Sequence, residues 1–128
     1  MDWLGFFLPR FGTRRQPLES LSPPRPEDLE RLAELREMGS RLDLPHPVRA
    51  FLVFPTEGQA REAGERLQKE GFSWQLRAAV DGTGAWMLTA ILQLVPTPGA
   101  ITRLREQLEA VGSPLEGVYR GWDAPVVY

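Results

Sequence analysis

The chain contains no cysteine and no asparagine, and it has one histidine (His46) and one lysine (Lys69) among its 128 residues. The absence of cysteine excludes disulfides, thiolate chemistry and cysteine-ligated zinc sites. A single histidine leaves little for a histidine-ligated metal or a serine–histidine relay, and no nucleophile stands at a spacing that pairs it with a base. We therefore expect no catalytic residue, no metal site and no cofactor, and we predict that the protein is not an enzyme.

A strong excess of charge and long apolar runs are also missing. The chain has 15 lysine and arginine residues against 17 aspartate and glutamate residues, which gives a net charge of −2. Nucleic-acid-binding proteins usually carry a strongly basic face, so this balance argues against direct nucleic-acid binding. No segment approaches the roughly 20 apolar residues of a membrane-spanning helix, and the apolar N-terminus lacks the basic start of a signal peptide. We expect a cytoplasmic protein without a membrane span.

Residues 1–25 form a leader whose composition differs from that of the rest of the chain. It combines aromatic residues, basic residues and a proline- and serine-rich stretch that is typical of a linker. Such side chains are suited to contact RNA, a membrane surface or another protein; alternatively, the leader folds over its own domain with its arginines in water. Pro9 and Gly12 interrupt any long amphipathic helix, which favours the second interpretation. The aromatic and basic residues are Trp3, Phe6, Phe7, Phe11, Arg10, Arg14 and Arg15.

The remaining residues, 26–128, are predicted to form a single domain that starts with a helix over residues 26–39. Pro26 suits the first helical turn, where Glu27 and Asp28 complement the helix dipole. Gly39 is suited to end the helix. The apolar residues that follow the helical period, and that we expect to face the core, are Leu29, Leu32, Ala33, Met38 and Leu42.

Residues 48–122 carry the order strand, helix, strand, strand, helix, strand. The strands are predicted over 48–54, 72–78, 85–95 and 115–122, with 72–78 at an edge because its apolar and polar residues alternate. Thr56 and Thr97 are predicted to cap the two helices, and residues 81–84 are predicted to turn a hairpin. The order predicts an α+β, ferredoxin-like βαββαβ sandwich, in which a four-stranded antiparallel sheet carries two helices on one face.

The opposite face of this sheet is predicted to be apolar. Phe51, Val53, Met87 and Ile91 fall on it when the strands pair in that order. A contiguous apolar patch is rarely left in water, so we expect the first helix, the leader or another chain to cover it.

Three segments of the chain resemble the RraB family, which is named for the regulation of ribonuclease activity. They are residues 51–57, where a strand runs into a capped helix, residues 70–72 at the helix exit, and residues 116–126, which carry a Tyr-x-Gly-Trp motif followed by a proline. The resemblance implies a ferredoxin-like fold and a non-enzymatic protein that binds ribonuclease E, inhibits it and so alters RNA turnover. The best-known members are strongly acidic, and the family pattern favours aspartate where this chain has Arg120.

The same motif supplies the candidate partner-binding residues. Tryptophan and tyrosine are common anchors of protein interfaces. The alternative is that Tyr119 and Trp122 belong to the core while Gly121 allows a bulge or a tight bend, and this structural role is the interpretation we favour. The candidates are Tyr119, Arg120, Gly121, Trp122 and Pro125, together with Trp3, Phe6 and Phe7 of the leader.

Two further interpretations concern ligands and acid–base chemistry. Ferredoxin-like sheets also bind small molecules on their open face, so a small-molecule-sensing or ligand-binding domain, as a monomer or a dimer, is the alternative function. His46, Asp81 and Asp123 are predicted to lie in loops rather than to act as acid–base groups, because turn-forming proline or glycine lies close to each. The partner's identity and the number of subunits do not follow from the sequence.

Overall fold

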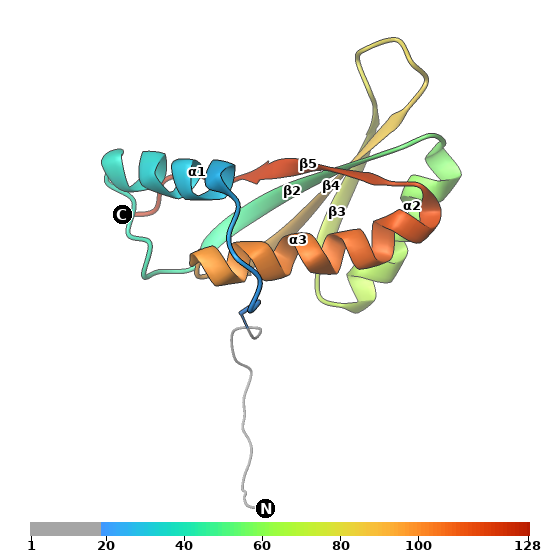
Figure 1. Ribbon diagram of the computed structural model, residues 1–128. Coiled ribbons are helices and arrows are strands. Elements are labelled where there is room, and N and C mark those ends of the chain that lie inside the picture. Colours follow the sequence, from blue (N-terminus) through green and yellow to red (C-terminus); the bar gives the residue numbers. More distant parts are fainter. Residues whose placement is uncertain (1–18) are drawn as a thin grey trace, which may run out of the picture.

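The computed structural model describes residues 19–128 (Figure 1). Trp3, Phe6 and Phe7 of the leader lie outside these residues, so the expectations about them, and the division into a leader and one domain, stay predictions. The described elements are α1 (Pro26–Glu37), β2 (His46–Phe54), α2 (Glu57–Lys69), β3 (Ser73–Ala78), β4 (Trp86–Leu94), α3 (Pro98–Gly112), the 3-10 turn η1 (Ser113–Leu115) and β5 (Val118–Asp123).

The four strands form one antiparallel sheet in the order β3-β4-β2-β5. The first and third strands of the βαββαβ core therefore lie at its centre, and the predicted edge position of β3 is confirmed. Helices α2 and α3 pack on one face of the sheet (Figure 1). This is the ferredoxin-like α+β arrangement that the sequence predicts.

Alternate residues of the central strand β2 build the core on this helix-covered face. Val48, Ala50, Leu52 and Phe54 are buried against the helices, as period-2 alternation requires. Helix α2 approaches the sheet closely because its inner face carries small residues. At Gly64 an added Cβ would lie 2.5 Å from the Trp74 ring, so a larger residue would push the helix away from β3.

Both predicted threonine caps are present. The side chain of Thr56 accepts a hydrogen bond from the Gln59 amide at 3.2 Å, and that of Thr97 accepts one from the Ala100 amide at 3.0 Å. Each cap satisfies an amide that the first helical turn leaves without a partner. The starts of α2 and α3 therefore follow from local sequence.

Helix α1 forms where the sequence predicts it, but it presents a different face. Leu32 is buried as expected, whereas Leu29 and Met38 are 45% and 56% exposed. The buried stripe instead consists of Asp28, Leu32 and Leu35. The predicted face was wrong because it assumed that only apolar residues turn inward, and α1 buries an aspartate.

Helix α1 lies beside α3 near one end of β5, and so extends the helix layer (Figure 1). It does not cover the other side of the sheet, which we call the open face. Among residues 19–128 the open face includes Arg49, Phe51, Val53, Gln75, Arg77, Met87, Thr89, Ile91, Val118, Arg120 and Asp123. Its predicted apolar residues are half-buried rather than enclosed. The first helix is thus excluded as the cover.

His46 and Asp123 were predicted in loops, and both lie in strands. His46 starts β2 and is fully buried. Its Nδ1 donates a hydrogen bond to the Leu44 carbonyl oxygen at 2.8 Å, and its Nε2 is hydrogen-bonded to the Ser40 hydroxyl at 2.6 Å. The Ser40 hydroxyl oxygen also accepts from the Val127 amide. A fully satisfied imidazole thus ties the end of the chain to the start of β2.

Candidate functional site

The Tyr-x-Gly-Trp motif forms a β-bulge in the edge strand β5. Tyr119 pairs with Leu52 of β2 and Gly121 pairs with Phe51, which leaves Arg120 as the extra residue. Gly121 has φ of +116°, a conformation that side chains rarely adopt. Because of the bulge, Tyr119 and Trp122 both face the helix layer although they lie three residues apart. The bulge predicted at Gly121 is confirmed.

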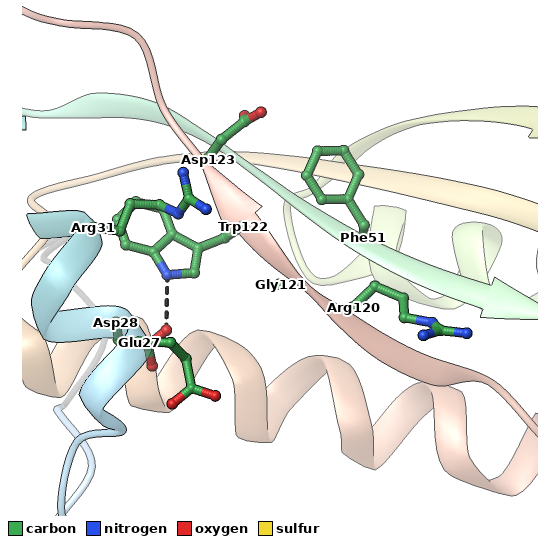
Figure 2. A pocket seen from close by; sticks show the side chains of 8 residues that line it. All are labelled: Glu27, Asp28, Arg31, Phe51, Arg120, Gly121, Trp122 and Asp123. Carbon is green, nitrogen blue, oxygen red and sulfur yellow. Dashed lines mark hydrogen bonds between the residues drawn. The ribbon is translucent and has the colours of Figure 1, made fainter. Parts of the chain in front are cut away.

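Trp122 is a core residue that joins β5 to α1. It is only 4% exposed, and its indole Nε1 donates a hydrogen bond to Oδ1 of Asp28 at 2.9 Å (Figure 2). The guanidinium carbon of Arg31 lies 5.9 Å from the ring centroid, within the range of a cation–π contact. The indole is therefore held between α1 and the sheet, and its side chain offers little surface to a partner.

Three buried side-chain polar atoms, on α1, β5 and α3, have no hydrogen-bond partner among the described residues. They are Oδ2 of Asp28, the Tyr119 hydroxyl and Nε of Arg105. Burial raises the pKa of the Tyr119 hydroxyl well above its ordinary value, and the negative charge of Asp28 raises it further. The arrangement favours a neutral phenol.

Arg120, the extra residue of the bulge, lies on the side of the sheet opposite the helix layer. It is exposed and lies on the open face beside Phe51 (Figure 2). Hydrogen bonds from Thr83 hold the pKa of Asp81 below its usual range, and the positive charge of Arg120 adds to this effect. Arg120 thus marks the margin of the open face near the β3–β4 hairpin.

A shallow groove of about 320 Å³ crosses the β5 edge at the bulge. A Cβ built on Gly121 would meet no atom within 4 Å, so the floor of the groove is open backbone. Asp123 lies at one end and is held by two hydrogen bonds from Arg49 at 2.8 and 2.7 Å. The lining residues are Glu27, Asp28, Arg31, Phe51, Arg120, Gly121, Trp122 and Asp123 (Figure 2).

Residues 25–124 match the sequence model of RraB, described as regulator of ribonuclease activity B. The chain belongs to the RraB family. The match covers well over half of the chain and includes every element from α1 to β5. No curated protein matches the sequence.

The residues of the Tyr-x-Gly-Trp motif and the proline after it fall into two groups, one structural and one exposed. Tyr119 and Trp122 hold β5 against the helices, and Gly121 supplies the bulge. Arg120 and Pro125 are exposed. The structure thus brings Tyr119 to Trp122 together at one strand, while Pro125 lies beyond it in the C-terminal tail.

Sequence reasoning missed three residues around the bulge of this RraB chain, namely Asp28, Arg31 and Phe51 as a groove residue. A signal for Asp28 exists in the spacing of α1, where residues 28, 32 and 35 lie on one helical face. Arg31 and Phe51 line the groove only because β5 lies close to both of them. No local sequence pattern predicts that approach.

Neither a metal site nor a membrane-crossing helix emerges from the part of the RraB chain that the structure describes. Within residues 19–128, no three His, Asp or Glu side chains gather closely enough to hold a metal ion. No helix in the same range has the length and apolar character needed to cross a bilayer. The groove offers charged and aromatic contacts, which suit binding.

Proposed function

We propose that this protein is a non-enzymatic regulator that binds a ribonuclease E-like endoribonuclease in the cytoplasm, inhibits it and so slows RNA turnover. The family match over residues 25–124 carries the proposal, because that family is named for the regulation of ribonuclease activity. Protein contact is the proposed mode of inhibition. The chain's net charge of −2 supports this mode, since competition for RNA would favour a basic surface.

The partner surface is proposed to include the exposed part of the Tyr119–Pro125 segment. Arg120 and Pro125 can touch another protein directly, whereas Tyr119 and Trp122 act by holding β5 in place. The leader residues Trp3, Phe6 and Phe7 remain part of the proposal as apolar anchors. Arginine and aromatic side chains at the centre of an interface commonly contribute most of its free energy.

The test is a titration of purified protein against the ribonuclease E homologue of the same organism, read out as cleavage of a labelled RNA. We expect inhibition that rises with protein concentration and is weakened by Arg120→Glu. Arg61→Glu is the matched control, because Arg61 is exposed on α2 and forms its ion pair with Glu57 of the same helix. If the protein neither binds nor inhibits the nuclease at concentrations of tens of micromolar, a weak limit on the affinity scale, the proposed partner is wrong.

Two control measurements address the competing functions. Incubation of the protein with RNA in the absence of the nuclease should leave the RNA intact, as expected of a non-enzymatic regulator. Tight RNA binding that weakens steeply with added salt would contradict inhibition through protein contact.

A further inference from the structure

The open face has a charge opposite to that of the whole molecule. It carries three arginines, Arg49, Arg77 and Arg120, against one aspartate, Asp123, although the chain as a whole has a net charge of −2. Asp123 is already engaged by Arg49 at 2.7 Å. Asp81 lies at the margin, where its carboxylate accepts two hydrogen bonds from Thr83. The face is therefore complementary to acidic groups.

The two remaining arginines have no carboxylate partner among residues 19–128. Neither Arg77 nor Arg120 forms an ion pair with any residue in the range 19–128, and the nearest polar contact of Arg77 is the sulfur of Met87 at 3.9 Å. Both side chains are exposed. A guanidinium in this position can form two parallel hydrogen bonds with a carboxylate, a geometry that lysine cannot supply.

Apolar side chains lie between these arginines. Phe51 and Val53 of β2 and Met87 of β4 are half-buried, and β2 and β4 place Val53 opposite Met87. Two shallow grooves of about 260 and 390 Å³ flank them, and Arg77 lines both. A flat apolar centre with exposed arginines beside it suits an extended segment in which apolar and acidic residues alternate. Its apolar side chains all point to one side and can pack on this centre, while the long arginine side chains can reach past it to the carboxylates.

We propose that the open face binds an extended acidic segment of a partner protein, whose apolar side chains pack on Phe51, Val53 and Met87 and whose carboxylates pair with Arg77 and Arg120. This deepens the proposed function, on which it rests, because the segment would belong to the regulated ribonuclease. Single-stranded RNA fits less well. Sheets that bind RNA stack two or three bases on aromatic rings, and the described part of this face has one ring, Phe51.

The direct test uses fluorescence anisotropy with a short labelled peptide in which aspartate alternates with leucine. Two probes of equal length serve as comparisons: the peptide with lysine in place of aspartate, and oligouridine. We expect the acidic peptide to bind best and its affinity to fall with salt. The double variant Arg77→Glu/Arg120→Glu should weaken it by about tenfold or more, because it removes two guanidinium donors and adds two carboxylates that repel the peptide.

The matched control is Arg61→Glu/Arg66→Glu on α2, which changes charge equally on the helix side and replaces two exposed arginines. It should leave peptide affinity unchanged within about twofold. An equal loss in both double variants, tighter binding of oligouridine, or concentration-dependent dimerisation that Phe51→Ser abolishes would each overturn the proposal. Circular dichroism and the melting temperature establish that every variant is folded.

A parallel nuclease assay separates this proposal from the proposed function. If the wild-type protein inhibits the ribonuclease and Arg77→Glu/Arg120→Glu inhibits equally well, the docking surface is wrong while the function stands. If the acidic peptide binds the wild-type protein but the nuclease is neither bound nor inhibited, the surface stands and the named partner is wrong. Loss of both peptide binding and inhibition in the open-face variant alone supports both.

Discussion

The same strands form two different faces of the sheet, one buried under the helices and one exposed. On the helix-covered face, Leu52 and Trp122 are enclosed, and the indole of Trp122 has its hydrogen bond from within the protein. On the open face, Phe51 is half-buried and Arg120 is exposed. The strand β5 contributes to both faces, because its bulge directs Tyr119 and Trp122 inward and leaves Arg120 outside.

This contrast shows that one short motif can build a scaffold and present a surface. The aromatic residues of the motif stabilise the position of β5, while Arg120 between them adds a positive charge to the open face. We expect a change at Arg120 to alter binding without altering the fold. Substitutions on the two faces should separate stability from binding, and the following predictions test that separation.

Replacement of Trp122 by alanine should produce the largest loss of stability. The substitution removes a buried ring and leaves the Asp28 carboxylate without its donor, so we expect a loss of about 3–5 kcal/mol in the free energy of unfolding. Urea denaturation measures it. Trp122→Phe keeps most of the ring and should cost less. A loss below about 1 kcal/mol for Trp122→Ala would show that the indole does not hold α1.

Leu52 and Phe51 are neighbours in sequence that face opposite sides of the sheet. Leu52 is fully buried, so Leu52→Ala should lower stability by about 2–5 kcal/mol. Phe51→Ala should lower it by about 1 kcal/mol, because its ring is already partly in water, yet it should reduce binding of the acidic peptide. Equal destabilisation by the two substitutions would mean that something covers the open face.

A substitution at Gly121 should change stability through backbone strain alone. Its φ of +116° is unfavourable for any residue with a Cβ, while the space around that Cβ is empty. Gly121→Ala should therefore cost about 1–3 kcal/mol. Gly58 is the matched control, because it also has free space but lies in the first turn of α2, where alanine is neutral or slightly stabilising. Similar melting temperatures for the two variants would rule out strain at the bulge.

Tyr119 should have the smallest effect at neutral pH and a distinct effect in alkali. Its hydroxyl has no partner among the described residues, so Tyr119→Phe should change stability by less than about 1 kcal/mol. The folded protein raises the pKa of Tyr119, whereas an unfolded tyrosine ionises near pH 10. Above about pH 10 the unfolded state therefore binds fewer protons than the folded state, and stability falls as pH rises.

The variant Tyr119→Phe removes this proton linkage. Its unfolding free energy should decline less steeply than that of the wild type between about pH 9 and about pH 11. Urea denaturation at several pH values provides the comparison. Parallel curves for the two proteins would indicate that Tyr119 is not shielded as the structure places it.

The parts of the fold that follow from sequence are those set by neighbouring residues. The caps at Thr56 and Thr97 and the placement of Phe51 and Val53 on the face opposite the helices depend on a few adjacent positions, and these features were predicted correctly. The bulge was also predictable, because glycine inside a strand that carries aromatics favours one. These features need no knowledge of distant segments.

The features that were missed depend on contacts between distant segments. The buried face of α1 was mispredicted because Asp28 turns inward only when Trp122 supplies a donor. His46 lies in a strand rather than in a loop because it pairs with Leu94 of β4, which is distant in sequence. The groove residue Arg31 could not be identified, since its position over Trp122 requires α1 to be docked.

The hydrogen bond between Asp28 and Trp122 also has a consequence for the order of folding. It joins residues 94 positions apart, near the two ends of the described chain. Closing so long a loop carries a large entropic cost, which is offset only after the intervening strands have paired. We expect α1 to dock late, so that changes at Leu32 and Leu35 speed unfolding and leave the refolding rate almost unchanged.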